Sequence, residues 1–462
     1  MESVSQELAR FAVETKFEDL PEDVVHEAKR GLLDSIGCAI AGITTEKGKM
    51  AIQLAKRLGG PPESSIMGMG GKVSCSNAAF ANGELINALD YDAMPHLHLF
   101  VVPPSLAVAE SIHASGQDVI LATVLGQEIS RRISSGLSGM MEKLLDGLKP
   151  LTVWGNGNHC IFGATAGTGK ILKLGEKEMT HALGIAGYLT PVPAAGKWDT
   201  AVPKPIIKYT PVGWICSSAV TAALIAEMGY SGDTSVFDGD YGFWRFYSSE
   251  KWNPDAVLDK IGKRWLFTSV HYKVYPCCSF LHSQLDCFIS IIEKNHLMPE
   301  DIDSVKTYGL PLYASPKPME VSNQVDAQFS RPYVLALAAH RIKIGADWQD
   351  FDMIRNLRIQ EFMKKVSFQV HPGAGEAKHK DPRSWLAKVE VAARGKTFVE
   401  ERMYARGTAV DGFKLTDEDL MEKFRGNVSR RLTEDKIDKA IKSLLQLESI
   451  EDITELTKRV AL

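Results

Sequence analysis

At residues 273–282 the chain reads KVYPCCSFLH, and the hydrophobic pattern differs on the two sides of this stretch. Before it, apolar residues recur at helical spacing, whereas after about Trp265 short strand-like runs alternate with helices. Lysine, tyrosine, cysteine and histidine gather where one pattern gives way to the other, and junctions between domains favour pockets. The simpler alternative is a proline-marked turn from strand to helix whose polar groups only cap the helix.

The part of the chain before this stretch is predicted to form one helix after another. Pro21 stands near a first helical position, Glu22 and Asp23 follow in the first turn, and apolar residues recur at helical spacing from 24 to 40. Similar patterns predict helices over about residues 50–58, 77–89, 119–133, 178–189 and 213–228. Several of these helices are rich in Ala, Gly and Ser, which allows close helix packing.

Strand-like runs follow at residues 302–310, 366–370, 387–393 and 397–403. The RGK at 394–396 separates the last two runs and is typical of a hairpin turn. Helices return at Thr416, where Asp419 three residues later resembles a capping box. We therefore predict a mainly α fold, with a large all-helical domain built from both chain ends, residues 1–265 and 408–462, and a smaller α/β domain, residues 266–407.

The composition excludes some classes of partner. The 53 basic and 57 acidic residues nearly cancel, without a long run of one sign, so neither nucleic acid nor a membrane surface is expected to bind. No apolar stretch reaches the roughly 20 residues that cross a bilayer. The polar N-terminus lacks a signal-peptide pattern, and seven cysteines without regular spacing favour reduced thiols. We expect a cytoplasmic protein that binds a small molecule or a second copy of itself.

Two motifs resemble ligand-binding motifs, but the positions of their residues do not favour ligand binding. The GATAGTGK at 163–170 resembles a phosphate loop, but Ala164 stands where that loop needs glycine and Ile171 where it needs Ser or Thr. A close-packed helix is the better interpretation. The adjacent thiols at 277–278 cannot both face one metal comfortably, so buried structural cysteines are expected there.

A third cluster leaves two alternatives open. Asp90, Asp92, His96 and His98 supply metal-capable side chains within nine residues, so a divalent site is conceivable. No second cluster at a recognised ligand spacing accompanies them, which favours a polar cluster without metal.

Three segments resemble, in order, signature segments of the MmgE/PrpD superfamily: Asp90-Tyr91-Asp92, Lys208 placed five residues before Gly213, and residues 273–282. Weaker likeness at 326–333 and 407–424 extends the resemblance over almost the whole chain. The superfamily includes 2-methylcitrate dehydratase, cis-aconitate decarboxylase and iminodisuccinate epimerase. The resemblance implies that the α/β domain is a lid, that the active site lies between the domains of a homodimer, and that the enzyme acts on a small carboxylic acid without metal or organic cofactor.

The shared chemistry of such enzymes assigns roles to particular residues. A carbanion beside a carboxylate needs nearby cations, and its formation needs an acid or base, most often an imidazole. We predict that Lys208 and Lys273 bind anionic oxygens and that Asp90 orients the acid/base group. That group is predicted to be His98, with His159 or Tyr275 as its partner. The predicted substrate-binding residues are Asp92, His96, Trp154, Cys278 and His282.

The chain departs from the family pattern and is a divergent member. The PPS at 103–105 stands where relatives have His-Pro-Ser, Trp154 stands where dehydratases and decarboxylases carry a second histidine, and the AM at 93–94 replaces Asp and Thr. Either neighbouring histidines have taken over these roles, or the acid/base groups changed along with the substrate. Trp154 and an apolar loop predicted at 97–102 favour a substrate with an apolar portion and fewer carboxylates.

Three functional hypotheses follow. The leading one is a cofactor-free lyase or isomerase that transfers a proton alpha to a carboxylate, by dehydration, decarboxylation or epimerisation. The second is a catalytically retired paralogue that binds a metabolite or a partner protein. The third is a metal-dependent hydro-lyase that uses Asp92, His96 and His98.

Overall fold

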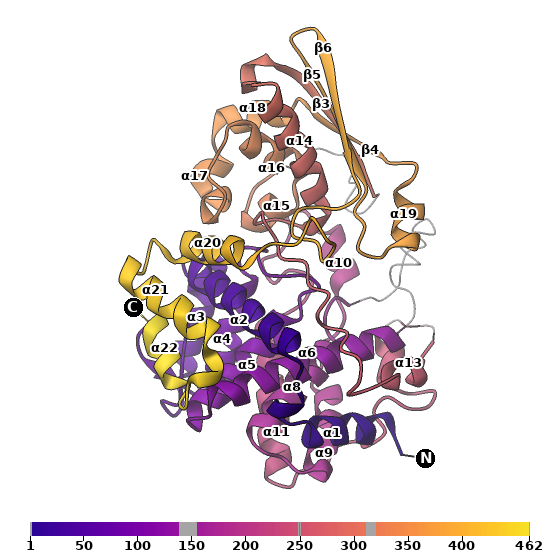
Figure 1. Cartoon of the computed structure of the whole chain (residues 1–462), viewed down its shortest axis with the longest axis vertical. Helices are drawn as coiled ribbons and strands as arrows, with labels where there is room; N and C mark the ends of the chain where they lie inside the picture. Colours follow the sequence, from indigo (N-terminus) through magenta and orange to yellow (C-terminus); the bar gives the residue numbers. More distant parts are fainter. Residues whose placement is uncertain (1, 138–154, 248, 250, 311–319, 462) are drawn as a thin grey trace.

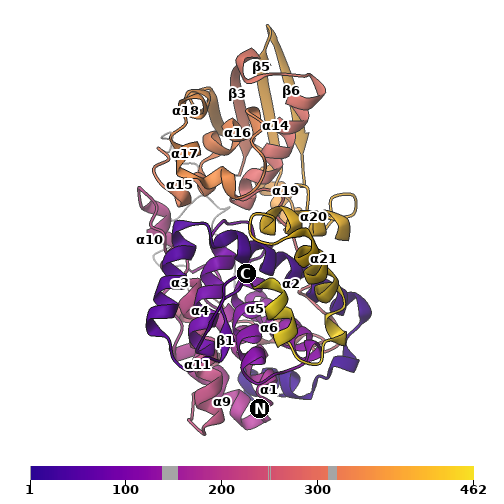
Figure 2. The same ribbon diagram turned by 90° about the vertical axis from the view of Figure 1, so that its left-hand side faces the viewer.

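The computed structural model describes residues 2–137, 155–247, 249, 251–310 and 320–461, and it is mainly α-helical (Figure 1). A larger lobe of helices lies below a smaller lobe in which helices pack on one sheet (Figures 1 and 2). The fold class predicted from the sequence is therefore confirmed. Among the described residues, no helix combines the length and the apolar character needed to cross a membrane.

The first half of the chain builds most of the larger lobe. Its helices are α1 Val4–Glu14, α2 Glu22–Gly42, α3 Glu46–Leu58, α4 Cys75–Asn87, α5 His98–Ser111, α6 Gly116–Gly136, α8 Cys160–Ile171, α9 Glu176–Tyr188, α10 Ala195–Thr200, α11 Val212–Glu227, α12 Phe243–Phe246 and α13 Pro254–Leu258. A short antiparallel pair, β1 Ser64–Ser65 and β2 Lys72–Val73, accompanies them. Each helix predicted in this half has a counterpart here, and α2 begins after Pro21 with Glu22 and Asp23 in its first turn.

Helix α5 corrects the prediction of an apolar loop at 97–102. His98 is its first residue, and Pro103 and Pro104 lie inside it. Prolines donate no backbone hydrogen bond, so the carbonyls one turn earlier, at Leu99 and Phe100, lose their helical partners. The thiol of Cys216 on α11 contacts both carbonyl oxygens, at 3.4 and 3.7 Å. The apolar residues of this helix are buried in the core, so they give no support for an apolar substrate.

The glycine-rich motif at 163–170 forms the middle of helix α8, as the close-packed interpretation predicts. A Cβ atom on Gly163 would lie 2.0 Å from the carbonyl oxygen of Gly126 on α6. The two backbones therefore touch, and the motif packs helices together.

The smaller lobe holds one four-stranded sheet, in the order β4-β3-β5-β6. Its strands are β3 Ile302–Gly309, β4 Val366–Val370, β5 Ala387–Ala393 and β6 Lys396–Arg402, and its helices are α14 His282–Lys294, α15 Gln324–Phe329, α16 Arg331–Ala339, α17 Phe351–Ile354, α18 Leu357–Met363 and α19 Ala374–Lys380. Strands β3 and β4 are parallel, and the other pairs are antiparallel. Arg394 and Gly395, with φ of 51° and 69°, make the two-residue hairpin turn that the sequence predicts.

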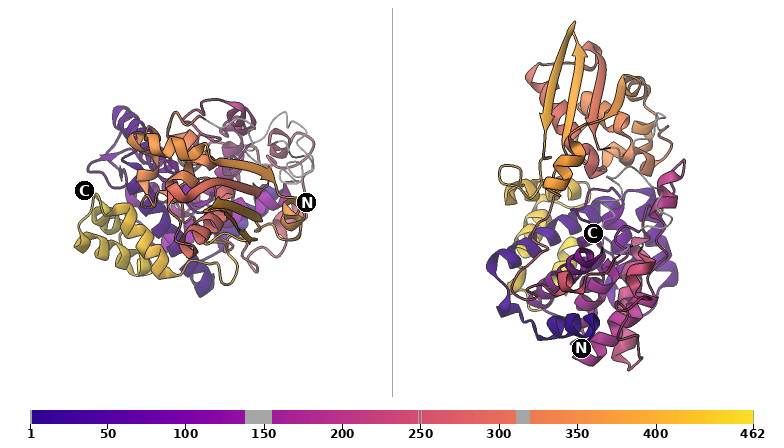
Figure 3. Two further views of the ribbon diagram at one scale, coloured as in Figure 1. Left: turned by 90° about the horizontal axis from the view of Figure 1, so that it is seen from above. Right: turned by 90° about the vertical axis from the view of Figure 1, so that its right-hand side faces the viewer.

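The C-terminal helices α20 Asp417–Val428, α21 Glu434–Leu445 and α22 Thr454–Val460 return to the larger lobe (Figures 2 and 3). Helix α20 starts with the predicted capping box of Thr416 and Asp419. Phe424 of this helix belongs to the same hydrophobic core as α2 and α4. The two chain ends thus share one core, while the limits of the domains at 265 and 408 stay a prediction.

The connections between the lobes run side by side just before Lys273. His271 pairs with Met94 in an isolated antiparallel bridge, and the Tyr272 amide donates to the carbonyl of Gly407. Gly407 has a φ of 94°, and a Cβ there would lie 2.0 Å from the carbonyl oxygen of Tyr272. Only glycine fits this close approach. Lys273 therefore lies at the seam between the lobes.

Candidate active site

Two lysines hold one carboxylate at this seam. The Lys208 Nζ lies 2.5 Å from Oδ1 of Asp90, and the Lys273 Nζ lies 2.7 Å from Oδ2. Lys208 also donates to the carbonyl of Asn87, at 3.2 Å, and Lys273 to that of Asp90, at 2.7 Å. An ammonium group has three donors, so, counting acceptors among the described residues, each lysine retains one for a further acceptor. All three side chains are buried.

The charges in this triad shift the pKa of every member. Burial would raise the pKa of Asp90, but Lys208 and Lys273 outweigh it and hold that pKa far below its ordinary value. Burial lowers the pKa of Lys208 to about 8, although Asp90 opposes this effect. For Lys273, Asp90 and Asp92 outweigh burial, and the pKa rises. The triad thus carries a net positive charge, and Lys208 is the member that loses its proton most easily.

A second chain of hydrogen bonds lies beside the triad. Nδ1 of His96 is 2.7 Å from Oδ2 of Asp92, and Nε2 of His96 is 2.9 Å from the hydroxyl of Tyr209. Burial would raise the pKa of Asp92, but His96 outweighs burial and lowers it. The Asp92 carboxylate fixes a proton on Nδ1, and the Tyr209 hydroxyl, which contacts Nε2, also donates to Oδ1 of Asp90 at 3.5 Å. We call Asp92, His96 and Tyr209 the proton relay.

The backbone is strained at three residues of this region. Asp90, His96 and Lys208 adopt φ values of 54°, 41° and 61°, in the left-handed region that side chains rarely enter. Each such residue costs on the order of 1–3 kcal/mol and persists only where the surroundings enforce it. Strain of this kind gathers at functional sites.

Buried polar groups of the larger lobe hold the Asp-rich segment. Lys423 of α20 lies 2.6 Å from Oδ1 of Asp34 and donates to the carbonyl of Tyr91 at 2.7 Å. Oδ2 of Asp34 accepts from the amide of Ala93, at 3.0 Å. The C-terminal return of the chain therefore helps to position Asp90 and Asp92.

Two glutamines of the smaller lobe also hydrogen-bond to the backbone near the Asp-rich segment. Gln328 donates to the carbonyl of Ala88, and Gln349 donates to the carbonyls of Leu89 and Pro276. These bonds of 2.7 to 2.9 Å tie both lobes to the residues next to Asp90.

Residues 275–282 contribute less direct chemistry than their composition implies. The Tyr275 hydroxyl donates to Asp286 at 2.8 Å, and burial together with Asp286 raises its pKa. His282 lies in the first turn of α14, bonded through Nε2 to the carbonyl of Cys277, and burial lowers its pKa well below the usual value. Burial raises the pKa of Cys278 to about 12, so this residue is a thiol beside the triad.

The predicted acid/base histidine, His98, interacts electrostatically with Asp92 of the relay but has no hydrogen bond to it in the described ranges. The His98 ring packs onto α2, where a Cβ on Gly31 would be 1.9 Å from Nε2, and this nitrogen has no hydrogen-bond partner in the described ranges. Burial lowers its pKa to about 4. His159 bonds instead to the Tyr247 hydroxyl at 3.0 Å, and burial lowers its pKa to about 4. Trp154 lies outside the described residues. The structure thus brings together Asp90, Lys208 and Lys273, with Asp92 and His96 beside them.

The metal alternative requires Asp92, His96 and His98 to converge. Both nitrogens of His96 are already hydrogen-bonded, and His98 faces α2. Across the described ranges, no three Cys, His, Asp or Glu side chains form a group suited to a metal ion.

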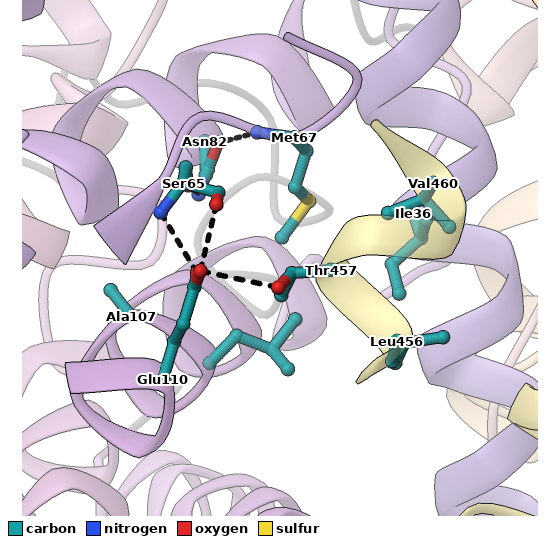
Figure 4. Close-up of a pocket in the computed structure, with 10 residues that line it drawn as sticks. Ile36, Ser65, Met67, Asn82, Ala107, Glu110, Leu456, Thr457 and Val460 are labelled. Carbon is teal, nitrogen blue, oxygen red and sulfur yellow. Dashed lines mark hydrogen bonds between the residues drawn. The ribbon is translucent and has the colours of Figure 1, made fainter. Parts of the chain in front are cut away.

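A small pocket lies elsewhere, between α22 and the helices of the larger lobe (Figure 4). Its main charged group, Glu110, accepts from the amide and hydroxyl of Ser65 and from the hydroxyl of Thr457. Lys72 completes the pairing, at 3.0 Å. Because this carboxylate is fully engaged and no member of the triad lines the pocket, the site at the seam is the better candidate.

Buried cations around one carboxylate, with a proton relay beside them, make up the candidate site. Residues 6–255 match the MmgE/PrpD N-terminal domain, and residues 275–447 match the MmgE/PrpD C-terminal domain. The chain therefore belongs to the MmgE/PrpD family, as the sequence predicts. It is a dehydratase- or decarboxylase-like enzyme.

Curated relatives agree with this assignment. The chain is 26% identical to the cis-aconitate decarboxylase of Homo sapiens, over 99% of this chain and 94% of that protein. It is 25% identical to the cis-aconitate decarboxylase-like protein oryM of Aspergillus oryzae, over 98% of this chain and 96% of that protein. The cis-aconitate decarboxylase of Aspergillus terreus is 29% identical over 61% of this chain and 59% of that protein.

Sequence reasoning missed Tyr209 as a site residue. Its only local signal is its position directly after Lys208. The contact with His96 joins residues 113 positions apart, so it depends on the packing of the segment after α10 against the Asp-rich segment.

Proposed function

We propose that this chain is a lyase that moves a proton alpha to a carboxylate of a small carboxylic acid. The observation that carries the proposal is the buried triad of Lys208, Asp90 and Lys273 beside the proton relay. The relatives named as cis-aconitate decarboxylases support the choice of a lyase.

The free N–H groups of the two lysines bind the substrate carboxylate. When a C–H or C–C bond beside that carboxylate breaks, its electron pair remains on carbon and spreads onto the carboxylate oxygens. The lysines stabilise this charge more strongly in the low-dielectric interior than water would. Asp90 keeps both ammonium groups in place, and its own charge leaves the triad at a single net positive charge.

The proton relay supplies the acid and base. To remove a substrate proton, the Tyr209 oxygen takes it from carbon while the Tyr209 hydroxyl proton passes to Nε2 of His96. The resulting imidazolium is stabilised by Asp92, 2.7 Å from Nδ1. For decarboxylation the relay starts with His96 as an imidazolium: the Tyr209 hydroxyl proton passes to the carbanion, Nε2 of His96 returns a proton to Tyr209, and solvent then reprotonates His96. In an epimerisation the first proton abstraction has already formed the imidazolium. His96 therefore takes the part that the sequence assigned to His98.

Decarboxylation is the favoured reaction within this class. In that case the bond to one carboxylate breaks, carbon dioxide leaves, and the relay protonates the remaining carbon. Dehydration needs in addition an acid for the leaving hydroxyl, a task that would fall to Lys208, which already binds the substrate carboxylate.

The chain is proposed to act as a homodimer in the cytoplasm. Trp214 on helix α11 is 50% exposed, and an exposed indole is the feature of this helix that supports a protein contact. All seven cysteines are buried and free, which agrees with a reducing compartment.

The test is turnover of a panel of di- and tricarboxylates, including cis-aconitate, 2-methylcitrate and substituted succinates, by the wild type and by Lys208→Ala. The expected result is loss of one acid in the wild type and no turnover in a folded Lys208→Ala. The matched control is Lys29→Met, which removes a partly buried lysine paired with Glu448 outside the triad. Wild-type rates in Lys208→Ala would remove the proposal.

A further inference from the structure

Lys47, the second residue of helix α3, is a buried cation outside the triad. Its Nζ lies 2.8 Å from Oε2 of Glu84 and donates to Oδ1 of Asn87 at 2.9 Å. The side chains of Lys47 and Glu84 are each only 7% exposed. Because charges lose their water on burial, such a pair adds little stability compared with apolar residues of the same size. Stability alone therefore does not explain the pair.

Asn87 connects this pair to the triad. Its side-chain Oδ1 accepts from Lys47, and its backbone carbonyl accepts from Lys208 at 3.2 Å. Both ammonium groups therefore bind the same residue, at the C-terminal end of helix α4. Two cations bound to one neutral residue repel each other, and salt screens this repulsion little when both are buried.

Glu84 holds the segment that carries Lys208. Its Oε2 binds Lys47, and its Oε1 accepts from the amide of Gly213 at 2.7 Å. Gly213 is the second residue of helix α11 and follows Lys208 by five positions. A Cβ on Gly213 would lie 2.7 Å from the carbonyl oxygen of Phe80, so the backbones of α11 and α4 touch here. The Glu84 carboxylate thus links Lys47 to the start of α11 and keeps the segment of Lys208 against α4.

We propose that Lys47 and Glu84 form a positioning pair, which holds Lys208 in place and controls whether its amine carries a proton. The importance of this control for catalysis rests on the proposed function, in which Lys208 acts as a cation. Burial lowers the pKa of Lys208 and Asp90 opposes this effect, while the charge of Lys47 lowers the pKa more strongly than that of Lys273 does. A lysine outside the triad therefore affects how easily Lys208 loses its proton.

Two further titratable groups face Lys208. The ring centre of Tyr209 lies 5.4 Å from Nζ of Lys208, and the Cys278 thiol interacts with this lysine electrostatically. Burial raises the pKa of Cys278 to about 12, so the thiol adds no charge near pH 8. Neither residue changes when Lys47 is substituted, so a change in the titration of Lys208 reports the loss of the Lys47 charge.

The test measures the pKa of Lys208 by NMR, in the full chain labelled with carbon-13 at the lysine Cε atoms. The signal of Lys208 is the one that Lys208→Arg lacks. Lys47→Met removes the nearby positive charge and is expected to raise the pKa of Lys208 by about one pH unit. Lys47→Arg keeps the charge and is expected to leave this pKa unchanged. Lys29→Met, which removes a lysine paired with Glu448, is the matched control and should give the wild-type value.

A double variant covers the case in which Lys47→Met does not fold. Lys47→Met leaves the Glu84 carboxylate buried without its partner, which is strongly destabilising. Lys47→Met combined with Glu84→Gln removes both charges, and the glutamine oxygen can still accept from Gly213. Because no unpaired carboxylate remains, the pKa of Lys208 is expected to rise by less than in Lys47→Met alone.

The outcomes separate this inference from the proposed function. In the active enzyme, the pH at which kcat/KM declines is expected to move upward together with the pKa of Lys208. An unchanged pKa in Lys47→Met and in the double variant would overturn the inference and leave the proposed function intact, since the pair would then be purely structural. An equal rise in Lys47→Arg would also overturn it, because the charge would not be the cause. The expected rise without turnover of any acid in the panel would support the inference and overturn the proposed function.

Discussion

The ammonium group of Lys208 lies 2.5 Å from the Asp90 carboxylate, and both side chains are buried at the seam between the lobes. Lys273 binds the other oxygen of the same carboxylate. The two lysines and one carboxylate together keep a net positive charge in a buried position. The ability to bind and stabilise an anion therefore depends on the protonation state of Lys208.

Activity is expected to fall at alkaline pH because Lys208 acts as a cation. Its pKa of about 8 lies below that of an ordinary lysine, so the ammonium form is lost as pH rises through this value. We predict that kcat/KM, which reports the free enzyme, declines about tenfold per pH unit above about pH 8. Lys208→Arg keeps a permanent charge and should remove this decline, at a lower maximal rate. A pH profile that rises through pH 8 would instead make Lys208 a base.

Removal of the Tyr209 hydroxyl is expected to stop proton transfer without loss of binding. Tyr209→Phe keeps the ring against Trp198 and Phe329 but leaves Nε2 of His96 without its donor. We predict a fall in kcat of about 10²- to 10⁴-fold at unchanged KM, the range for general acid–base catalysis. Tyr247→Phe, which removes the partner of His159, is the matched control and should retain activity. An active Tyr209→Phe together with an inactive Tyr247→Phe would assign the acid/base role to His159.

Substitution of His96 and of His98 distinguishes the proton relay from the acid/base role that the sequence predicts for His98. His96→Gln breaks the bonds to Asp92 and Tyr209, and we expect it to be inactive yet folded. His98→Gln alters a ring that packs on α2 and is expected to keep most of the activity at some cost in stability. Steady-state rates and melting temperatures of both variants show which of the two histidines is needed for activity. An active His96→Gln with an inactive His98→Gln would restore the role assigned from the sequence.

The sequence predicted correctly the elements whose conformation depends on residues next to one another in the chain. Helix α2 has acids in its first turn, and the hairpin at Arg394 and Gly395 needs only residues that accept positive φ. Helix α5 could not be predicted in this way, because Pro103 and Pro104 break the helical pattern locally. The compensating thiol comes from Cys216, 117 residues away from Leu99. Tertiary packing therefore overrode the local signal.

The candidate site was predictable only in part, for the same reason. Asp90, Lys208 and Lys273 lie in segments that resemble family signatures, so their importance was visible in the sequence. The pairing of His96 with Tyr209 depends on contacts between distant segments. His96 and His98 have the same local signal in the sequence, so the sequence does not distinguish them. Only the structure shows which of the two rings contacts a hydroxyl group.

The exposed Trp214 of α11 provides a prediction on assembly. Trp214 is 50% exposed, and a charge at its position would be buried in a dimer formed through this face. We expect Trp214→Glu to sediment as a monomer where the wild type sediments as a dimer. Met298→Glu, on an equally exposed residue of the smaller lobe, is the control. A dimer that survives Trp214→Glu would place the contact on another face.

The most direct measurement of the central claim is proton NMR of the wild type in deuterium oxide with the panel of di- and tricarboxylates. Formation of a carbanion beside a carboxylate predicts one deuterium at the alpha carbon of the product, and no such incorporation with Lys208→Ala. Turnover that leaves the alpha carbon without solvent deuterium would contradict decarboxylation, and silence across the whole panel would contradict proton transfer beside a carboxylate at this site.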